Sequence, residues 1–285
     1  MRILIFGAGG QLARELEQVL EGDEVLALTH AEADICDGNA VERQARRFRA
    51  ECLVNTAAFH RVDDCEDEVE RSFAVNAVAL TNLVRAAQAV RATLVHFSTD
   101  YVFDGAQRHP YRETDVPNPL SIYAMSKLAG EQIVRQYAPR HFLIRTCGLY
   151  ARGGSRGKGG NFVETMLRLA SEGRTIRVVD DQVATPTSAA DLARGLAPLL
   201  HSERFGLYHM TNLGSCSWYE FAQEIFRLAN LPADIRPISS AEFHAKARRP
   251  PYSVLDNYAL RQAGFPELPP WEHALAAYLR ERLRG

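Results

Sequence analysis

The sequence predicts an α/β protein built on a doubly wound parallel sheet, followed by a smaller mixed α/β lobe. Three observations lead to this prediction: short apolar runs alternate with amphipathic segments, a glycine-rich turn follows the first run, and the texture changes after residue 150. Continuous apolar runs suit parallel strands that are buried on both faces. Strand–helix alternation of this kind implies right-handed crossover connections.

The predicted elements follow from periodicity along the chain. Six runs rich in Val, Ile, Leu and Phe are expected as strands: 3–6, 24–28, 52–55, 93–97, 142–145 and 176–179. Five segments with helical patterning are expected as helices: 11–20, 40–49, 69–90, 122–136 and 162–172. After residue 150, a glycine-rich run at 153–160, short strands at 206–210 and 235–238 and frequent prolines indicate a loop-rich second lobe.

The composition is that of an ordinary globular protein with nearly balanced charge. Its 285 residues include 33 Lys and Arg against 35 Asp and Glu, a net charge of −2. No basic run is dense enough to indicate nucleic-acid binding, and we expect neither a signal peptide nor an apolar stretch near the roughly 18 residues of a membrane span. Five scattered cysteines without C-x-x-C spacing argue against a disulfide framework and a zinc site. The sequence thus predicts a cytoplasmic protein without nucleic-acid or membrane partners.

A glycine-rich turn joins the first predicted strand to the first predicted helix. Gly7, Gly9 and Gly10 follow the strand, and Gln11 and Leu12 open the helix. Glycine permits the tight turn, lets the backbone approach a pyrophosphate and leaves that charge facing a helix N-terminus. This placement predicts a dinucleotide-binding domain over residues 1–150, with 174–201 returning to it, and a substrate-binding lobe over most of 151–285.

The end of the second predicted strand bears on the choice of dinucleotide. A domain that prefers NAD usually carries an acid about twenty residues after the glycines, for the ribose 2′-hydroxyl. Here Thr29 and His30 stand at that place, and Asp34 is too far along to be the obvious ribose ligand. The pattern favours NADPH, with NADH left open, and we expect Asp34 and Ile35 among the further cofactor contacts.

Proton-transfer chemistry is indicated by Tyr123 and Lys127, which share a face of one predicted helix. A tyrosine has a pKa of about 10, and a nearby cation lowers that pKa and makes the phenol usable for proton transfer. Thr99 ends the fourth predicted strand, at the edge of the sheet where such folds bind ligands. We therefore expect Thr99 to hydrogen-bond a substrate carbonyl.

Together these motifs resemble the extended short-chain dehydrogenases/reductases and, within that superfamily, the dTDP-4-dehydrorhamnose reductases. The resemblance covers nearly the whole chain, and its most specific part is the run Ser98-Thr99-Asp100-Tyr101-Val102-Phe103-Asp104-Gly105. Further matches are the runs at 55–58, 123–131, 145–146, 161–162, 181–182, 185–187, 206–209 and 248–250.

Family membership implies an activity and residue roles. It implies a Rossmann fold and NAD(P)H-dependent reduction of the C4 ketone of a nucleotide-linked 4-keto-6-deoxy sugar, with dTDP-4-dehydrorhamnose giving dTDP-L-rhamnose as the leading case. Thr99, Tyr123 and Lys127 become the catalytic triad, and Ala57 and Ala58 line the cofactor together with Tyr123 and Lys127. The implied substrate contacts are Val62, Thr99, Asp100, Tyr101, Asn161, Gln182 and Arg248.

One departure from the family pattern concerns the sugar pocket. The family usually carries a tryptophan where this chain has Gly148. Loss of that aromatic wall predicts a roomier pocket, or one filled by Phe59, His60 or Tyr101, and leaves the sugar open. If the pocket is roomier, we expect weak activity on dTDP-4-dehydrorhamnose and better activity on a bulkier keto-sugar.

Two other function classes stay open at this point. The regulatory beta subunit of methionine adenosyltransferase is similar to this family and binds NADP without catalysis, although the complete triad favours an enzyme. A sugar-nucleotide epimerase or dehydratase is disfavoured because dehydratases place an acid where Tyr101 stands. Some relatives are homodimers with a divalent ion. The acids at comparable places, Glu15, Asp191 and Glu281, are better explained as surface carboxylates, so no metal site is predicted.

Overall fold

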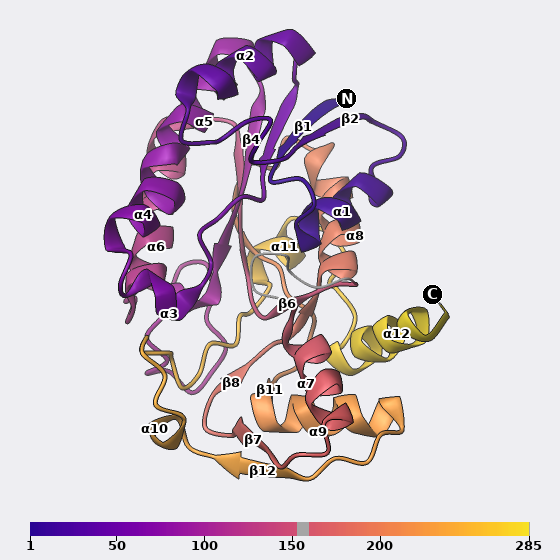
Figure 1. The fold of residues 1–285 in the computed structure, drawn as a ribbon. Helices are drawn as coiled ribbons and strands as arrows, with labels where there is room; N and C mark the ends of the chain where they lie inside the picture. The colour runs from indigo at the N-terminus through magenta and orange to yellow at the C-terminus, as the bar shows by residue number, and fades with distance from the viewer. Residues whose placement is uncertain (153–159, 285) are drawn as a thin grey trace.

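A six-stranded parallel sheet forms the centre of the computed structural model, which describes residues 1–152 and 160–284 (Figure 1). Its strands are β1 (Arg2–Phe6), β2 (Glu24–Leu28), β3 (Cys52–Asn55), β4 (Thr93–Thr99), β5 (His141–Thr146) and β10 (Gly206–His209). Their spatial order is β2-β1-β3-β4-β5-β10. The chain changes direction across the sheet between β1 and β3, which is the kind of switch point where open α/β sheets bind ligands. The doubly wound fold class is confirmed.

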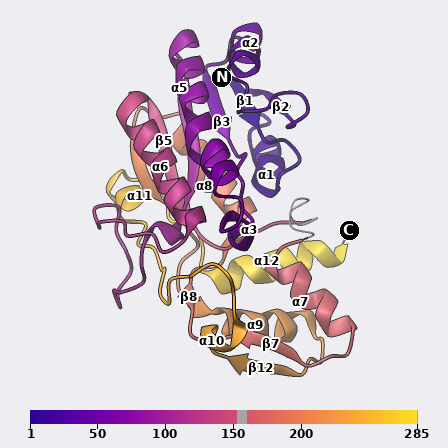
Figure 2. The ribbon, with the colours of Figure 1, turned by 60° about the vertical axis from the view of Figure 1, so that its left-hand side comes forward.

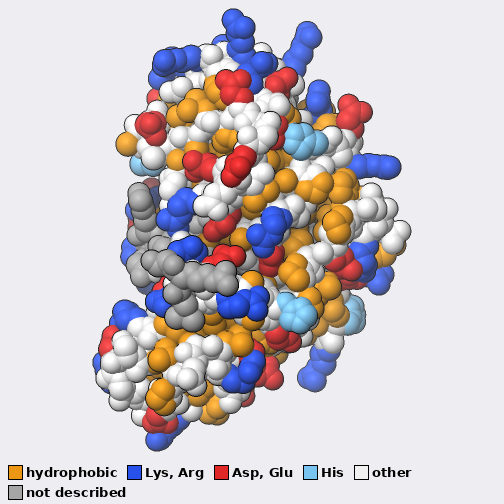
Figure 3. Space-filling view, turned by 90° about the vertical axis from the view of Figure 1, so that its right-hand side faces the viewer, with side chains coloured by type: hydrophobic (Ala, Val, Ile, Leu, Met, Phe, Trp, Pro, Cys, Tyr) orange, Lys and Arg blue, Asp and Glu red, His pale blue; other side chains and the backbone are white. Residues whose placement is uncertain are grey.

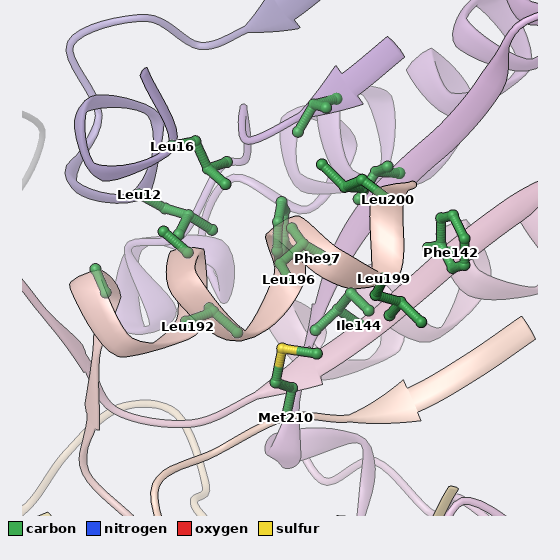
Figure 4. Packing of buried hydrophobic residues seen from close by; sticks show 14 of the residues in the cluster. Leu12, Leu16, Phe97, Phe142, Ile144, Leu192, Leu196, Leu199, Leu200 and Met210 are labelled. Carbon is green, nitrogen blue, oxygen red and sulfur yellow. The ribbon is translucent and has the colours of Figure 1, made fainter. Parts of the chain in front are cut away.

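Helices cover both faces of this sheet (Figures 1 and 2). Helices α1 (Gln11–Val19) and α8 (Ala189–Leu200) lie on one face, where Leu12 and Leu16 pack against Leu192 and Leu196 over strand residues such as Phe97 (Figure 4). The other face carries α2 (Gly38–Phe48), α5 (Ala79–Val90) and α6 (Ile122–Tyr137), which share a second apolar cluster with β1, β3 and β4. Burial on both faces explains why the strand sequences are continuously apolar.

One long helix differs from the sequence expectation. Segments α4 (Val69–Phe73), the π-helical η1 (Ala74–Val78) and α5 run without a break over Val69–Val90. By length and composition this helix could cross a membrane, with a mean hydropathy of 1.2, whereas we had expected no stretch near that limit. Its apolar stripe, including Leu80 and Leu83, is buried against the sheet and α2, which is the packing of a core helix.

Helix α6 approaches this long helix very closely. A Cβ atom at Gly130 would lie 2.2 Å from the backbone oxygen of Asn76 in η1, so only glycine fits there. The Asn76 amide donates to the Phe59 carbonyl (2.8 Å) and to the Ser126 hydroxyl (3.0 Å). These contacts fix the helix that carries Tyr123 and Lys127.

The second lobe has its own small sheets and apolar cluster, seen at the lower end of Figure 1. Strand β7 (Ile176–Val179) pairs with β12 (Ile235–Ile238), β8 (Val183–Ala184) with β11 (Cys216–Ser217), and β6 (Leu149–Tyr150) with β9 (Thr187–Ser188). The surrounding helices are α7 (Phe162–Ser171), α9 (Trp218–Ala229), α10 (Ser240–Phe243) and α12 (Trp271–Arg284), while α11 (Tyr258–Gln262) packs beside β10.

Two strand expectations need correction. We expected the run at 176–179 to continue the strand series of the main sheet, but β7 pairs only with β12, while β10 occupies the edge beside β5. Both are four-residue segments that mix apolar and polar side chains, so the local pattern could not tell which sheet each one joins. Residues 153–159 of the glycine-rich run lie outside the described residues. On the face in Figure 3, basic and acidic side chains are interspersed.

Candidate active site

The glycine-rich loop after β1 lies directly against the loop after β3. Gly7 and Gly9 have φ angles of +95° and +78°, which favour glycine. A Cβ at Gly7 would lie 2.7 Å from Thr56 Oγ1 and 2.8 Å from the Ala57 nitrogen. Helix α1 follows, with Gly10 as its N-cap and no side chain capping its first N–H groups. This cradle fits a pyrophosphate, because the backbone is open and the helix N-terminus faces it.

Three residues that were expected to contact ligands have side chains that are engaged within the protein itself. The Gln11 side-chain oxygen accepts from the Ala151 N–H (2.9 Å) and from the Asn161 amide (3.0 Å), and the Leu12 side chain is buried in the core. Asn161 also caps α7 by accepting from the Glu164 N–H (3.0 Å). Asn161 therefore has a capping role in this structure, the Gln11 and Leu12 side chains are engaged within the fold, and contacts of these residues with ligands stay predictions.

An acid does lie at the end of β2, contrary to the sequence analysis. The Glu32 carboxylate accepts from the N–H (2.8 Å) and the hydroxyl (2.7 Å) of Thr29, and these hydrogen bonds lower the pKa of Glu32. His30 is exposed, with its Nδ1 3.6 Å from Asp34 Oδ1. From the sequence, Thr29, His30 and Asp34 were considered but not Glu32, whose carboxylate a turn brings back to Thr29.

We expect Glu32→Gln to increase affinity for NADPH relative to NADH by about three- to tenfold. A carboxylate at the end of β2 repels the 2′-phosphate of NADPH, and replacing it by a neutral amide removes this repulsion. Fluorescence titration of both coenzymes measures the ratio, with Glu42→Gln on the exposed face of α2 as the charge-matched control. An unchanged ratio would remove Glu32 from the site.

The remaining predicted cofactor residues lie around the same sheet edge. The Ala57 N–H donates to the Asn55 side chain (3.1 Å), and Ala57 and Ala58 are both partly exposed on the loop after β3. Ile35 has a buried side chain, and its carbonyl accepts from Asn82 (3.0 Å). A side-chain contact from Ile35 to a cofactor is thus not supported, although its backbone stands on the exposed loop beyond β2.

Thr99 ends β4 and is anchored by a buried acid. Its hydroxyl donates to Asp100 Oδ1 (3.0 Å) in the short η2 helix (Asp100–Val102). Asp100 also accepts from Cys147 Sγ (3.0 Å) and the Ser253 hydroxyl (2.5 Å), and only 2% of it is exposed. Asp100 therefore holds Thr99 and two neighbouring loops in place, and its contact with substrate stays a prediction.

Tyr123 lies in the first turn of α6, close to both Thr99 and Tyr101. Burial raises the pKa of Tyr123, and a hydrogen bond with Thr99 opposes this rise. The Tyr101 ring packs edge-on to the Tyr123 ring, with centroids 6.3 Å apart. The structure thus brings together the Thr99 and Tyr123 hydroxyls, as the sequence predicts.

Lys127 is placed differently from the expectation. Its Nζ donates to the Phe97 carbonyl (2.6 Å) and lies 3.2 Å from His96 Nε2, and only 2% of the residue is exposed. Burial lowers the pKa of Lys127 to about 8. In this structure Lys127 therefore does not lower the pKa of Tyr123, because its amine is hydrogen-bonded to β4 on the strand side of α6.

The predicted substrate residues of the second lobe form a looser set. Gln182 donates to the Ser240 hydroxyl (2.7 Å) and is largely buried, whereas Arg248 is exposed. The neighbouring Arg249, which the sequence analysis passed over, forms two hydrogen bonds to Asp63 (3.1 and 2.9 Å) in α3 (Val62–Cys65). Val62 begins that helix, so the loop after β3 and the C-terminal segment are tied together beside Tyr101.

The structure explains why residue 148 is a glycine. Its φ of +54° favours glycine, and a Cβ there would lie 3.3 Å from both the Pro186 Cα and the end of the Trp218 ring. Trp218, at the start of α9, thus fills the space beside Gly148. The expectation that Phe59, His60 or Tyr101 would do so is replaced by this residue from 70 positions further along the chain.

In the described parts of the chain, no three acids, histidines or cysteines gather closely enough to hold a metal ion. Of the acids considered from the sequence, Asp191 is paired with Arg194 (2.5 Å) and Asn212 (3.0 Å). Glu15 is half-buried, and burial and the nearby Glu281 raise its pKa. Asp191 therefore has structural partners of its own.

Comparison with known proteins places this geometry in a family. Residues 1–284 match the model described as RmlD substrate binding domain. The chain belongs to this family. It is 41% identical over 283 residues to a dTDP-4-dehydrorhamnose reductase of Streptomyces griseus, covering 96% of this chain and 91% of that protein.

Two further relatives agree with the family assignment. The spore coat polysaccharide biosynthesis protein SpsK of Bacillus subtilis is 40% identical, with 99% of this chain and 98% of that protein covered. The crystal structure of a Bacillus anthracis dTDP-4-dehydrorhamnose reductase in complex with NADP superimposes with a TM-score of 0.95 at 39% identity, over 98% and 99% of the two chains. The resemblance inferred from the sequence motifs is confirmed.

Proposed function

We propose that the protein is an NADPH-dependent oxidoreductase that reduces the C4 ketone of a dTDP-linked 4-keto-6-deoxy sugar, with dTDP-4-dehydrorhamnose as substrate and dTDP-L-rhamnose as product. The observation that carries this proposal is the paired Thr99 and Tyr123 hydroxyls at the same sheet edge as the glycine cradle. Full-length similarity of about 40% to named reductases supports the same activity.

The chain's own residues supply binding and proton transfer. Bound NADPH supplies the hydride. The glycine cradle and the α1 N-terminus hold its pyrophosphate, and the loop bearing Ala57 and Ala58 lines it. The Thr99 hydroxyl, whose one proton is directed to Asp100 in the ligand-free structure, turns to donate to the sugar C4 oxygen. Tyr123 gives its phenolic proton to that oxygen as negative charge develops there. Lys127 is the proposed partner of the cofactor ribose and of the Tyr123 oxygen.

We further propose that the cofactor and the nucleotide sugar bind to two different parts of the molecule. The six-stranded sheet with α1, α2, α5, α6 and α8 binds the cofactor. In this part, α8 falls in the segment 174–201 that was expected from the sequence to return to it, whereas β10 lies beyond both expected ranges. The lobe with β7, β12, α7 and α9 binds the nucleotide sugar, with Gln182 and Arg248 as candidate contacts. A cytoplasmic location and a homodimer stay predictions.

Turnover tests this function. The wild-type protein is mixed with dTDP-4-dehydrorhamnose and NADPH, and loss of absorbance at the nicotinamide band is followed. We expect NADPH consumption that depends on the sugar. NADPH binding without consumption would favour a non-catalytic regulatory subunit, and dehydration or epimerisation of a nucleotide sugar without net NADPH consumption would favour the other alternative.

Trp218 is expected to provide the aromatic wall of the sugar site. Trp218→Ala should raise KM for the nucleotide sugar about three- to tenfold with kcat nearly unchanged, because an aromatic contact contributes about 0.5–1.5 kcal/mol to ground state and transition state alike. Tyr219→Ala, the neighbouring residue of α9, is the matched control. Equal KM values for the two variants would place the sugar elsewhere. Gly148→Trp is not used, because the positive φ strains any side chain there.

A further inference from the structure

A buried chain of polar side chains connects the end of β3 to Lys127. Asn55 Nδ2 lies 3.1 Å from His96 Nδ1, and His96 Nε2 lies 3.2 Å from Lys127 Nζ. Asn55 and His96 are each only 1% exposed, and Lys127 only 2%. The reduction proposed above gives neither Asn55 nor His96 a part. Because these three polar groups are buried and in contact, each hydrogen-bond donor among them must face an acceptor.

The orientation of the Asn55 amide is dictated by the backbone. Its Oδ1 accepts from the Ala57 N–H at 3.1 Å. Reversing the amide would set its NH₂ group against that N–H, so Nδ2 is the atom that faces His96. Because Nδ2 can only donate, His96 Nδ1 accepts and carries no proton. A neutral imidazole then has its proton on Nε2.

His96 also stays neutral. Burial is the largest cause that lowers the pKa of His96 well below its ordinary value. A second proton on Nδ1 would in addition face the Asn55 NH₂ group. The ring therefore presents an Nε2–H donor to the lysine nitrogen.

This donor is incompatible with an ammonium group. A charged lysine has three N–H donors and no lone pair, whereas a neutral amine has one lone pair. A neutral Lys127 accepts from His96 Nε2–H and still donates to the Phe97 carbonyl at 2.6 Å. Every hydrogen bond in the chain is then complete.

The surrounding charges do not supply a counter-ion for an ammonium at this place. Glu131, one turn along α6, raises the pKa of Lys127, but both of its oxygens are bonded to Arg145 of β5 (2.9 and 2.6 Å). The other titratable groups around the Tyr123–Lys127 face of α6 are His96 of β4, Asp100 and Tyr101 of η2, Cys65 of α3 and Cys147 after β5.

We propose that Asn55 and His96 are positioning residues that fix one tautomer of the imidazole and thereby lower the proton affinity of Lys127 in the ligand-free protein. This inference rests on the proposed function only for its kinetic consequence. Lys127 then loses its charge, and with it the support that this charge gives to a Tyr123 phenolate, at a lower pH than an ordinary lysine does. The residues act through Lys127 and touch neither substrate nor cofactor in this scheme.

The first test needs no substrate. Lysine occurs only at 127, 158 and 246, so ¹³C-lysine NMR gives three signals that Lys158→Arg and Lys246→Arg assign. We expect the Lys127 signal to titrate near pH 8, below the ordinary lysine value, and the ¹⁵N shifts of His96 to show a proton on Nε2. Titration of Lys127 at the ordinary lysine value, or a proton on Nδ1, would overturn the proposal.

The second test reverses the tautomer. In Asn55→Asp a carboxylate accepts from His96 Nδ1–H, so Nε2 becomes an acceptor and the pKa of Lys127 should rise by at least about one unit, a tenfold change in its proton affinity. The alkaline limb of kcat/KM, which reports free-enzyme groups, should move upward by the same amount. The double variant Asn55→Asp/His96→Phe keeps the added charge and removes the imidazole.

The two variants separate tautomer from charge. We expect most of the pKa rise to vanish in the double variant. A rise of equal size in both would show that the added charge acts alone and would overturn the role of His96. Absence of reductase activity with the expected NMR titrations would instead overturn the proposed function and leave the assignment of Asn55 and His96 intact.

Discussion

Tyr123→Phe is expected to lower kcat by roughly 10²–10⁴-fold while leaving NADPH affinity nearly unchanged. The substitution removes only the phenolic oxygen, and general acid catalysis is worth about that factor. The ring remains to pack against Tyr101. Steady-state kinetics with dTDP-4-dehydrorhamnose and a fluorescence titration of NADPH measure the two quantities.

The control for this prediction lies on the same helix. Tyr137→Phe, at the exposed end of α6, removes an identical oxygen far along the helix from Thr99 and should leave kcat unchanged. A loss below about tenfold in Tyr123→Phe would assign proton donation to another group.

Glu131→Ala is expected to cost about 3–5 kcal/mol of the free energy of unfolding. Glu131 and Arg145 form a bidentate pair between α6 and β5, with their side chains 0% and 1% exposed. Removing one partner leaves the other charge buried without compensation. Denaturant unfolding followed by circular dichroism measures the change.

Two comparisons make this stability prediction specific. The exposed pair of Arg168 and Glu172 on α7 should contribute less than about 1 kcal/mol, so Glu172→Ala is the surface control. The double variant Glu131→Leu/Arg145→Met should regain much of the lost stability, because apolar side chains replace buried ion pairs well. A Glu131→Ala variant as stable as Glu172→Ala would show that the pair does not anchor the catalytic helix.

Local sequence patterns predicted the features of the fold that interactions between residues near in sequence determine. The glycine turn at residues 7–10 could be located because positive φ and a helix N-terminus leave a compositional trace. Tyr123 and Lys127 could be placed on one helix face by their spacing alone. Which partner each side chain meets was a different question, and spacing could not answer it.

Most contacts that the sequence did not reveal join residues distant in sequence. Asp100 accepts from Ser253, 153 positions later. Asn161, in contrast, caps a helix by accepting from the N–H of Glu164, three positions later. The capping role of Asn161 had a usable signal, since an Asn directly before an apolar helical segment is typical of an N-cap. Trp218 beside Gly148 and His96 beside Lys127 had no such signal, because only the folded chain brings them together.

Deuterium transfer tests the central claim most directly. NADPH labelled with deuterium at nicotinamide C4, on each face in turn, is incubated with the wild-type protein and dTDP-4-dehydrorhamnose, and the sugar is analysed by NMR. The account predicts that one of the two labels appears at C4 of a dTDP-L-rhamnose product and that Tyr123→Phe slows its appearance. An unlabelled sugar from both cofactors, or deuterium at a carbon other than C4, would contradict it.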